Sequence, residues 1–230
     1  MNRKDYINKV KYIMSNNPIF GSYHKINFDR FGGLGESAPV NSSIINDIPR
    51  GKVVLSEQVY EMLLAINDVT KEDMKEVPFF LFGTEGSNNE IEFTEFMSSN
   101  SGMQSDEASF NNEMIEYLQN RINGEFNDGL VVCHGHSHPP IGKFHTNFSL
   151  GDLTTYIQMN EENEVFKNRK VELVGCLLTS TGDINFVFYD NKAQDFYRFT
   201  NVYVKDMYGN LTPVNCYGFN QGDSQRALNV

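Results

Sequence analysis

The sequence predicts an α/β protein built on one mixed sheet with helices packed against it. The chain has 230 residues, of which 40% are hydrophobic and 21% charged, and this composition suits a globular domain with a sizeable core. Segments with helical spacing of apolar residues alternate along the chain with short apolar runs that are typical of strands. Two pairs of these runs lie close enough in sequence to form hairpins, so the sheet should contain antiparallel pairs.

The first ordered part of the domain predicts one helix and one hairpin. The stretch KVVLSEQVYEMLLAIND, residues 52–68, has apolar residues at helical spacing after Ser56, which is a suitable N-cap. VPFFLFG, residues 77–83, is a short apolar run closed by glycine and predicts a buried strand. EIEFTEFM, residues 90–97, alternates apolar and polar residues and predicts its hairpin partner.

The second part of the domain alternates helices and strands in the same way. The expected elements are a helix over 106–123, a central strand over 129–138, a helix over 149–162 with Ser149 as N-cap, a hairpin of strands 171–180 and 183–190 joined through Thr181 and Gly182, and one further strand over 194–206.

Three regions follow from this reading. Residues 1–51 form an N-terminal extension, with a short amphipathic helix expected over 3–14 and a loop rich in Gly, Ser, Asn and Pro over 31–51. Residues 52–208 form the domain. Residues 209–230 form a polar, Gly-rich tail that is expected to fray.

Composition limits the partners and the compartment. The chain has 19 Lys and Arg against 30 Asp and Glu, a formal net charge of −11, which argues against binding to nucleic acid phosphates. No apolar stretch is long enough to span a membrane, and the N-terminal residues do not resemble a secretory signal. The three cysteines are far apart and unpaired in spacing, which favours reduced thiols and a cytoplasmic location.

The stretch HGHSHPP, residues 134–140, holds three of the five histidines in the chain. Side chains at positions i and i+2 of a strand share a face and lie about 6.6 Å apart. His136 and His138 can therefore converge on one metal ion, whose imidazole ligands lie at about 2.0–2.1 Å. His134 lies on the same face, roughly 13 Å from His138, and is expected in the second shell or in packing.

A third ligand should come from a nearby acid or histidine, because catalytic zinc normally has three protein ligands and one open position. Asp152 is the only acid between His138 and Glu161. In SLGD, Ser149 and Asp152 are three residues apart, which places both on one face of the first helical turn, at the positive end of the helix. His145, in the intervening loop, is the alternative ligand.

Other chemistries fit these residues less well. The metallo-β-lactamase pattern needs Asp at position 138, which is histidine, and the nucleobase deaminase pattern needs H-x-E and P-C-x-x-C, which are absent. A nucleophilic pair of Cys133 and His134 is disfavoured, since neighbouring residues of a strand face opposite ways. Cys133 is expected in the core.

HSHP followed by SLGD resembles the JAMM motif of the MPN+ (Mov34/JAB) metallopeptidases, in a member of prokaryotic type. The loop between His138 and Ser149 has ten residues, which is longer than in the family. The family also has a glutamate at the start of its first strand, in a pattern similar to EVPFFLFG from Glu76 to Gly83, although Phe79 replaces the first glycine of that pattern. The resemblance covers roughly residues 52–190.

The resemblance implies an MPN/JAB-like, cytidine-deaminase-like architecture and one zinc ion per chain. It implies His136, His138 and Asp152 as ligands, Glu76 as the general base and Ser149 as a donor to the oxyanion. The expected activity is zinc-dependent hydrolysis of peptide or isopeptide bonds in a protein or peptide substrate, including the removal of ubiquitin-like tails. A non-catalytic MPN scaffold and a hydrolase of small amide conjugates are the two alternatives.

Overall fold

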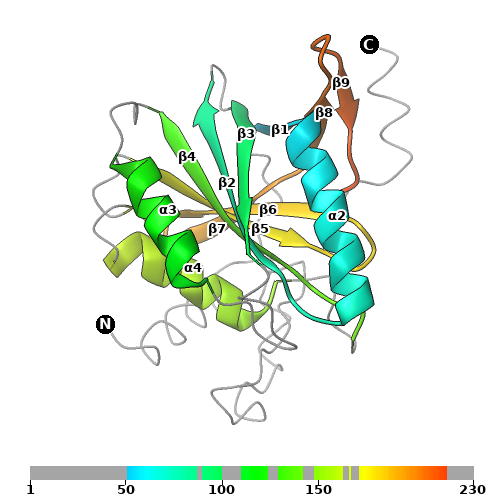
Figure 1. Cartoon of the computed structure of the whole chain (residues 1–230). Helices are drawn as coiled ribbons and strands as arrows, with labels where there is room; N and C mark the ends of the chain where they lie inside the picture. The colour runs from blue at the N-terminus through cyan, green and yellow to red at the C-terminus, as the bar shows by residue number, and fades with distance from the viewer. Residues whose placement is uncertain are drawn as a thin grey trace, which may run out of the picture.

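The computed structural model has one mixed sheet with helices on both of its faces (Figure 1). Helix α2 (Glu57–Asp73) covers one face, and helices α3 (Asn112–Ile122) and α4 (Leu150–Glu162) cover the other. This confirms the expected α/β class with a mixed sheet flanked by helices. The structure describes residues 51–86, 90–99, 110–123, 129–141, 148–162, 166 and 171–216. The helix expected over 3–14 and the loop expected up to residue 50 lie outside these residues.

The sheet has nine strands within the described residues. Their bounds are β1 (Lys52–Ser56), β2 (Pro78–Glu85), β3 (Glu90–Ser98), β4 (Leu130–Ser137), β5 (Glu172–Leu178), β6 (Ile184–Asp190), β7 (Asp195–Phe199), β8 (Asn201–Lys205) and β9 (Leu211–Pro213). The order across the sheet is β7-β6-β5-β4-β2-β3-β1-β8-β9. Strand β4 pairs with β5 in parallel and with β2 in antiparallel fashion, so the sheet is mixed at its centre.

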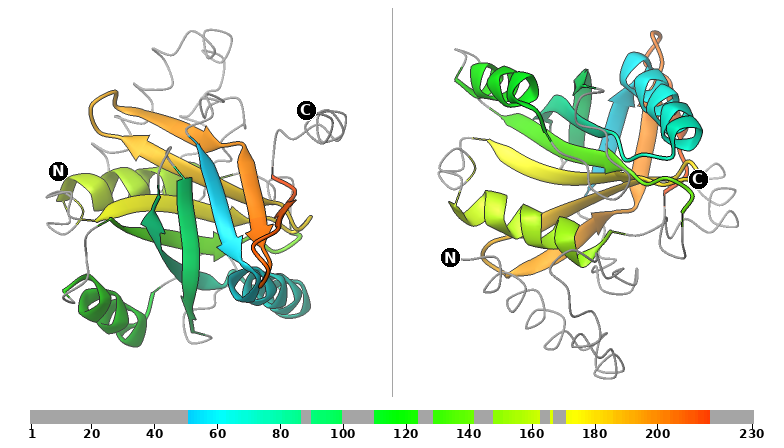
Figure 2. Two further views of the ribbon diagram at one scale, coloured as in Figure 1. Left: turned by 90° about the horizontal axis from the view of Figure 1, so that it is seen from above. Right: turned by 60° about the horizontal axis from the view of Figure 1, so that its bottom comes forward.

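The sheet is strongly curled. Strands β7 and β8 are separated by Thr200 alone, yet six strands lie between them in the order of the sheet. Two strands joined by one residue must lie close together, so the sheet has to bend round on itself, as Figure 2 shows. The buried side chains of Phe199 and Val202 join the same apolar cluster from the two sides of this junction.

The prediction from sequence joined β7 and β8 into one strand and did not include β1 and β9. The single strand expected over 194–206 is β7 and β8, which pair with β6 and with β1 respectively. The first residues of the expected 52–68 helix form β1, whose apolar core VVL is fully buried between β3 and β8. In the tail expected to fray, β9 pairs with β8, and Cys216 is buried.

The helices agree with expectation in kind and differ at their ends. Ser56 caps α2 as predicted, because its side chain accepts the Val59 N–H at 3.3 Å, and the helix continues to Asp73. Helix α3 begins after Asn111, whose side chain accepts the N–H of Met114, rather than at residue 106. The two expected hairpins are confirmed as β2–β3 and β5–β6.

Alternate residues of β2 and β4 face opposite layers, and this alternation positions the site. Phe79, Leu81, Val131 and Cys133 belong to the core under α2. Their even-numbered neighbours, such as Phe80 and Val132, belong to the core under α3. Cys133 therefore lies in the core as predicted, on the face opposite the histidines.

Within the part of the chain that the structure describes, no helix is both long and apolar enough to cross a membrane. The three cysteines are free and buried.

Candidate metal centre

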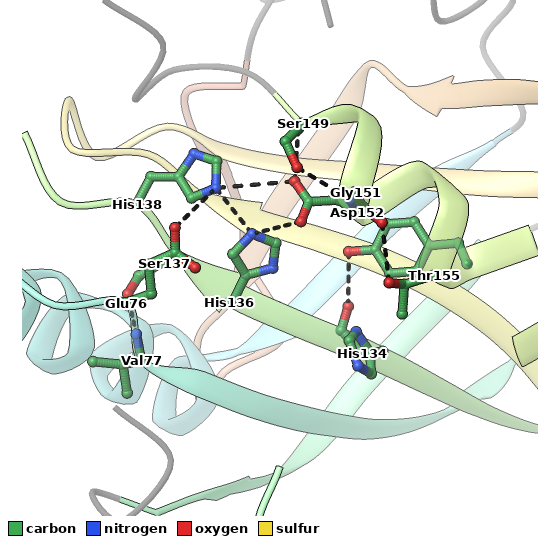
Figure 3. Close-up of polar contacts among 11 residues, drawn as sticks. Glu76, Val77, His134, His136, Ser137, His138, Ser149, Gly151, Asp152 and Thr155 are labelled. Carbon is green, nitrogen blue, oxygen red and sulfur yellow. Dashed lines mark hydrogen bonds and ion pairs between the residues drawn. The ribbon is translucent and has the colours of Figure 1, made fainter. Parts of the chain in front are cut away.

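Two histidines converge at the carboxyl end of β4. His136 is the next-to-last residue of the strand, and His138 follows its end, so both side chains leave the chain on the same face. Their Nε2 atoms lie 3.0 Å apart, and the residues are only 4% and 9% exposed (Figure 3). The backbone is held on both sides, because His136 pairs with Pro78 of β2 and the His138 N–H donates to the Leu178 carbonyl at 2.9 Å.

Two carboxylates approach the histidines from different elements. Asp152, in the first turn of α4, places Oδ1 3.3 Å from Nε2 of His136 and Oδ2 3.9 Å from Nε2 of His138. Glu76, in the short connection between α2 and β2, places Oε1 3.7 Å from Nε2 of His138. Figure 3 shows both carboxylates pointing toward the imidazoles. The structure thus brings together four of the residues that the sequence singled out.

The start of α4 is held by a reciprocal pair of hydrogen bonds. The Asp152 N–H donates to Ser149 Oγ at 3.1 Å, and the Ser149 N–H donates to Asp152 Oδ2 at 2.6 Å. The Leu153 N–H then donates to the Ser149 carbonyl, as the first backbone bond of the helix. Ser149 is therefore the N-cap, as predicted, and its bond to Asp152 fixes the carboxylate that faces the histidines.

Charge interactions decide the protonation of this cluster in the metal-free protein. Burial lowers the pKa of His136, but the charge and hydrogen bond of Asp152 outweigh burial and bring the pKa to about 9. Burial raises the pKa of Asp152, but the charge of His136, with His138 and the Ser149 N–H, outweighs it and holds this pKa well below its usual range. The two groups therefore form an ion pair at neutral pH.

His134 takes no part in this cluster. Its ring packs among Phe110, Phe80 and Tyr156, with centroid distances of 4.2, 5.8 and 5.6 Å. Burial, followed by the charge of His136, lowers its pKa to about 3, so the ring is neutral. Of the two roles expected for His134, the structure supports packing. The other candidate, His145, lies outside the described residues.

The donor set is suited to a metal ion. One oxygen of Glu76 and one nitrogen each of His136 and His138 lie within 4.8 Å of one another. Two nitrogens bound to one tetrahedral ion at about 2.0–2.1 Å are separated by about 3.3 Å, close to the 3.0 Å between the two Nε2 atoms. Asp152 Oδ1 lies at a comparable distance from His136, so either carboxylate can complete the set.

Two residues near the site were not predicted to have any role in it. Ser137 lies within HSHP, but the motif gave no reason to assign it a function. Thr70 belongs to no motif in the sequence. Their side chains are hydrogen-bonded to each other across 67 positions of sequence. No local pattern encodes such a contact, although the alternation of a strand already turns Ser137 away from the histidines and toward α2.

Comparison with known proteins adds no relative, because neither a family model nor a curated protein matches this chain.

Proposed function

We propose that the protein is a zinc-dependent hydrolase of peptide or isopeptide bonds, of the JAMM type that its motifs resemble. The observation that carries the proposal is the convergence of two buried histidines and two carboxylates from three separate elements. A catalytic site needs one acid to ligate and another to move protons.

We assign His136, His138 and Asp152 as the metal ligands. Two neutral imidazoles and one carboxylate leave one position of a tetrahedral ion open. Zinc in such a site supplies a bound water of lowered pKa and polarises a carbonyl group. The capping bond from Ser149 keeps Oδ2 of Asp152 occupied, so that Oδ1 is the oxygen directed at His136.

Glu76 is the general base in this proposal. Its side chain is 14% exposed and its carboxylate lies beside His138, which leaves it within reach of water and substrate. The carboxylate accepts a proton as the water oxygen adds to the scissile carbonyl, and it donates that proton to the amine as the C–N bond breaks. General acid–base catalysis of this kind contributes about 10²–10⁴-fold to the rate.

Ser149 stabilises the oxyanion in this proposal. Its Oγ already accepts the Asp152 N–H, so its own hydroxyl proton remains for donation. The N-terminus of α4 adds its positive end at the same place. Removal of one such donor typically lowers kcat by about 10²–10³-fold.

The finer fold assignment belongs to the same proposal. A central strand that ends in the histidines, a preceding hairpin strand with a glutamate at its start, and a helix that begins with Ser-x-x-Asp are the order of elements that the JAMM resemblance implies. The mixed, curled sheet with α2 on one face and α3 and α4 on the other supports an MPN-like architecture.

The first test measures the metal content of the purified protein by elemental mass spectrometry. The wild type should hold about one zinc per chain, which His138→Ala loses and which His134→Ala and His145→Ala keep. The variants of His134 and His145 are matched controls, since they remove the same ring without removing an assigned ligand. A wild type that takes up no metal even after incubation with zinc would refute the assignment.

The second test uses a substrate panel of a ubiquitin-like fusion, a free peptide and a small acyl-amino acid. Wild type and Glu76→Gln are compared at equal zinc content. Cleavage that Glu76→Gln abolishes supports the hydrolase and identifies its substrate class. A zinc-loaded protein that cleaves none of the three would instead favour the scaffold alternative.

A further inference from the structure

A buried pair of hydroxyl groups connects α2 with the segment that carries Glu76. Thr70 and Ser137 are both fully buried, and their side-chain oxygens share a hydrogen bond. Ser137 Oγ also accepts the Val77 N–H at 3.0 Å, and the Ser137 N–H donates to the Val77 carbonyl at 3.1 Å. Three hydrogen bonds therefore meet at one serine.

Because of its position, Ser137 connects the histidines with Glu76. It stands between His136 and His138 in sequence, and strand alternation turns its side chain to the face under α2. The N–H that it accepts belongs to the peptide group joining Glu76 to Val77. Ser137 therefore ties the backbone of both histidines to the backbone of Glu76 (Figure 3).

The connection that carries Glu76 needs such an anchor. Helix α2 ends at Asp73, Met74 turns the chain with a positive φ of 55°, and β2 begins only at Pro78. Glu76 thus lies between a helix end and a strand start, outside both. The Val77 N–H bond to Ser137 Oγ fixes the peptide group that joins Glu76 to Val77.

Thr70 orients the hydroxyl of Ser137. A hydroxyl group has one proton and two acceptor lone pairs. The bond with Thr70 restricts its rotation, so that a lone pair faces the Val77 N–H. Without Thr70 Oγ1, the serine hydroxyl would lack its buried partner and could turn toward other groups, because an unsatisfied buried polar group is costly.

We propose that Thr70 is a positioning residue that fixes Glu76 beside His138 through the hydroxyl of Ser137. The inference rests on the proposed function, because it assigns to Thr70 the placement of the general base. Thr70 lies six residues before Glu76, in α2, and its side-chain oxygen shares its hydrogen bond with Ser137 rather than with any of the four residues of the cluster. It acts through hydrogen bonds alone.

The test uses the full chain loaded with Co²⁺, whose visible absorption reports the groups around the ion. Thr70→Val keeps the β-branched shape and removes the hydroxyl. We expect it to bind one cobalt per chain as the wild type does, with an absorption spectrum shifted in the direction of that of Glu76→Gln. On a cleaved substrate, we expect kcat about 10- to 100-fold lower at unchanged KM. Thr70→Ser, which restores the hydroxyl, should resemble the wild type in both measurements.

Leu118→Ala in α3 is the control for lost stability, because it removes buried contacts without touching the network. A Thr70→Val spectrum identical to that of the wild type would overturn the inference, as would an effect that Leu118→Ala reproduces or that Thr70→Ser fails to rescue. A wild type that binds cobalt but cleaves nothing refutes the proposed hydrolase and leaves the spectrum to decide on Thr70. A wild type without a cobalt spectrum overturns both.

Discussion

Strand β4 carries the same side chain in two contrasting surroundings on one face. His134 lies among aromatic rings, and its Nδ1 atom is buried without a hydrogen-bond partner in the described part of the chain. His136, two residues later, lies against Asp152 and 3.0 Å from His138. Their pKa values move in opposite directions, to about 3 and to about 9.

The contrast shows that neighbouring acids, rather than the histidine repeat, distinguish the candidate metal centre. Burial lowers the pKa of an imidazole, and at His134 burial is the largest cause of the low value, followed by the charge of His136. Carboxylates reverse that effect only at the end of β4, where the start of α4 and the start of β2 converge. A metal site therefore needs a second element that contributes an acidic side chain, because the histidine repeat supplies only the nitrogen ligands.

The largest expected effect is the loss of stabilisation by metal in a histidine variant of the cluster. A ligand at 1,000 times its Kd stabilises the folded state by about 4 kcal/mol. For a domain of this size, that corresponds to a rise in Tm of about 8–16 °C. Excess zinc should raise Tm by this amount in the wild type and leave it unchanged in His136→Ala.

The matched variant for this experiment is His134→Ala. Its Tm without zinc should fall, since the ring packs against three aromatic residues, but its rise with zinc should equal that of the wild type. Thermal unfolding followed by circular dichroism measures both quantities. An equal loss of the zinc effect in the two variants would mean that all three histidines share the ion and that His134 and His136 do not differ in role.

The next effect is the pH dependence of the metal-free protein. The folded pKa of His136 is raised to about 9 from an unfolded value of about 6.5, so its ion pair contributes stability that is fully present below pH 6.5. This contribution is lost as pH rises through 9. The shift corresponds to about 3 kcal/mol, so the free energy of unfolding should fall by up to that amount between pH 6.5 and 9.

Asp152→Asn isolates this contribution. The variant removes the charge that raises the pKa of His136, so its free energy of unfolding should vary less over the same range. Urea unfolding of both proteins in the presence of a chelator measures the difference. Parallel pH profiles for the two proteins would show that the pair does not stabilise the fold.

The sequence predicted most of the fold because its periodicities are local. The cap at Ser56, the apolar run that predicted β2 and the alternation that predicted β3 all act over a few residues. Strand β1 was missed because its short apolar run, Val53 to Leu55, continues into the helix after Ser56 without a turn signal between them. The division of residues 194–206 into β7 and β8 was missed for another reason. Only the curl of the whole sheet gives these adjacent strands different partners.

The same distinction between local patterns and tertiary contacts applies to the residues of the site. His136 and His138 could be chosen from spacing along a strand, whereas spacing left Asp152 and His145 as alternatives for the third ligand. Glu76 could be chosen only from a resemblance, since an acid before a strand is usually a solvated surface residue. Thr70 could not be chosen at all, because its contact with Ser137 joins two elements that are distant in sequence. Tertiary packing, rather than local pattern, selects these last two residues.

A smaller effect is expected where α4 rests on the sheet. A Cβ atom at Gly175 would collide with the ring of Tyr156, which lies one helical turn after Asp152. Gly175→Ala should therefore displace α4, lower the free energy of unfolding by about 1–3 kcal/mol and weaken zinc binding. Titration calorimetry measures the affinity. Leu118→Ala, a loss of packing in α3, should lower stability without this loss of affinity.

The smallest effect is expected at His134 itself, when the ring is replaced by an apolar side chain of similar size. His134→Leu removes a buried Nδ1 atom that lacks a hydrogen-bond partner in the described residues and retains apolar contact with Phe110 and Phe80. Because replacing an unsatisfied polar group by an apolar one is close to neutral, the free energy of unfolding should change by less than about 1 kcal/mol, in either direction. Zinc content should stay at that of the wild type, whereas the same substitution at His136 should abolish it. A marked loss of stability or of zinc in His134→Leu would show that Nδ1 has a polar partner in the working protein, and that the two ends of the histidine face are coupled rather than distinct.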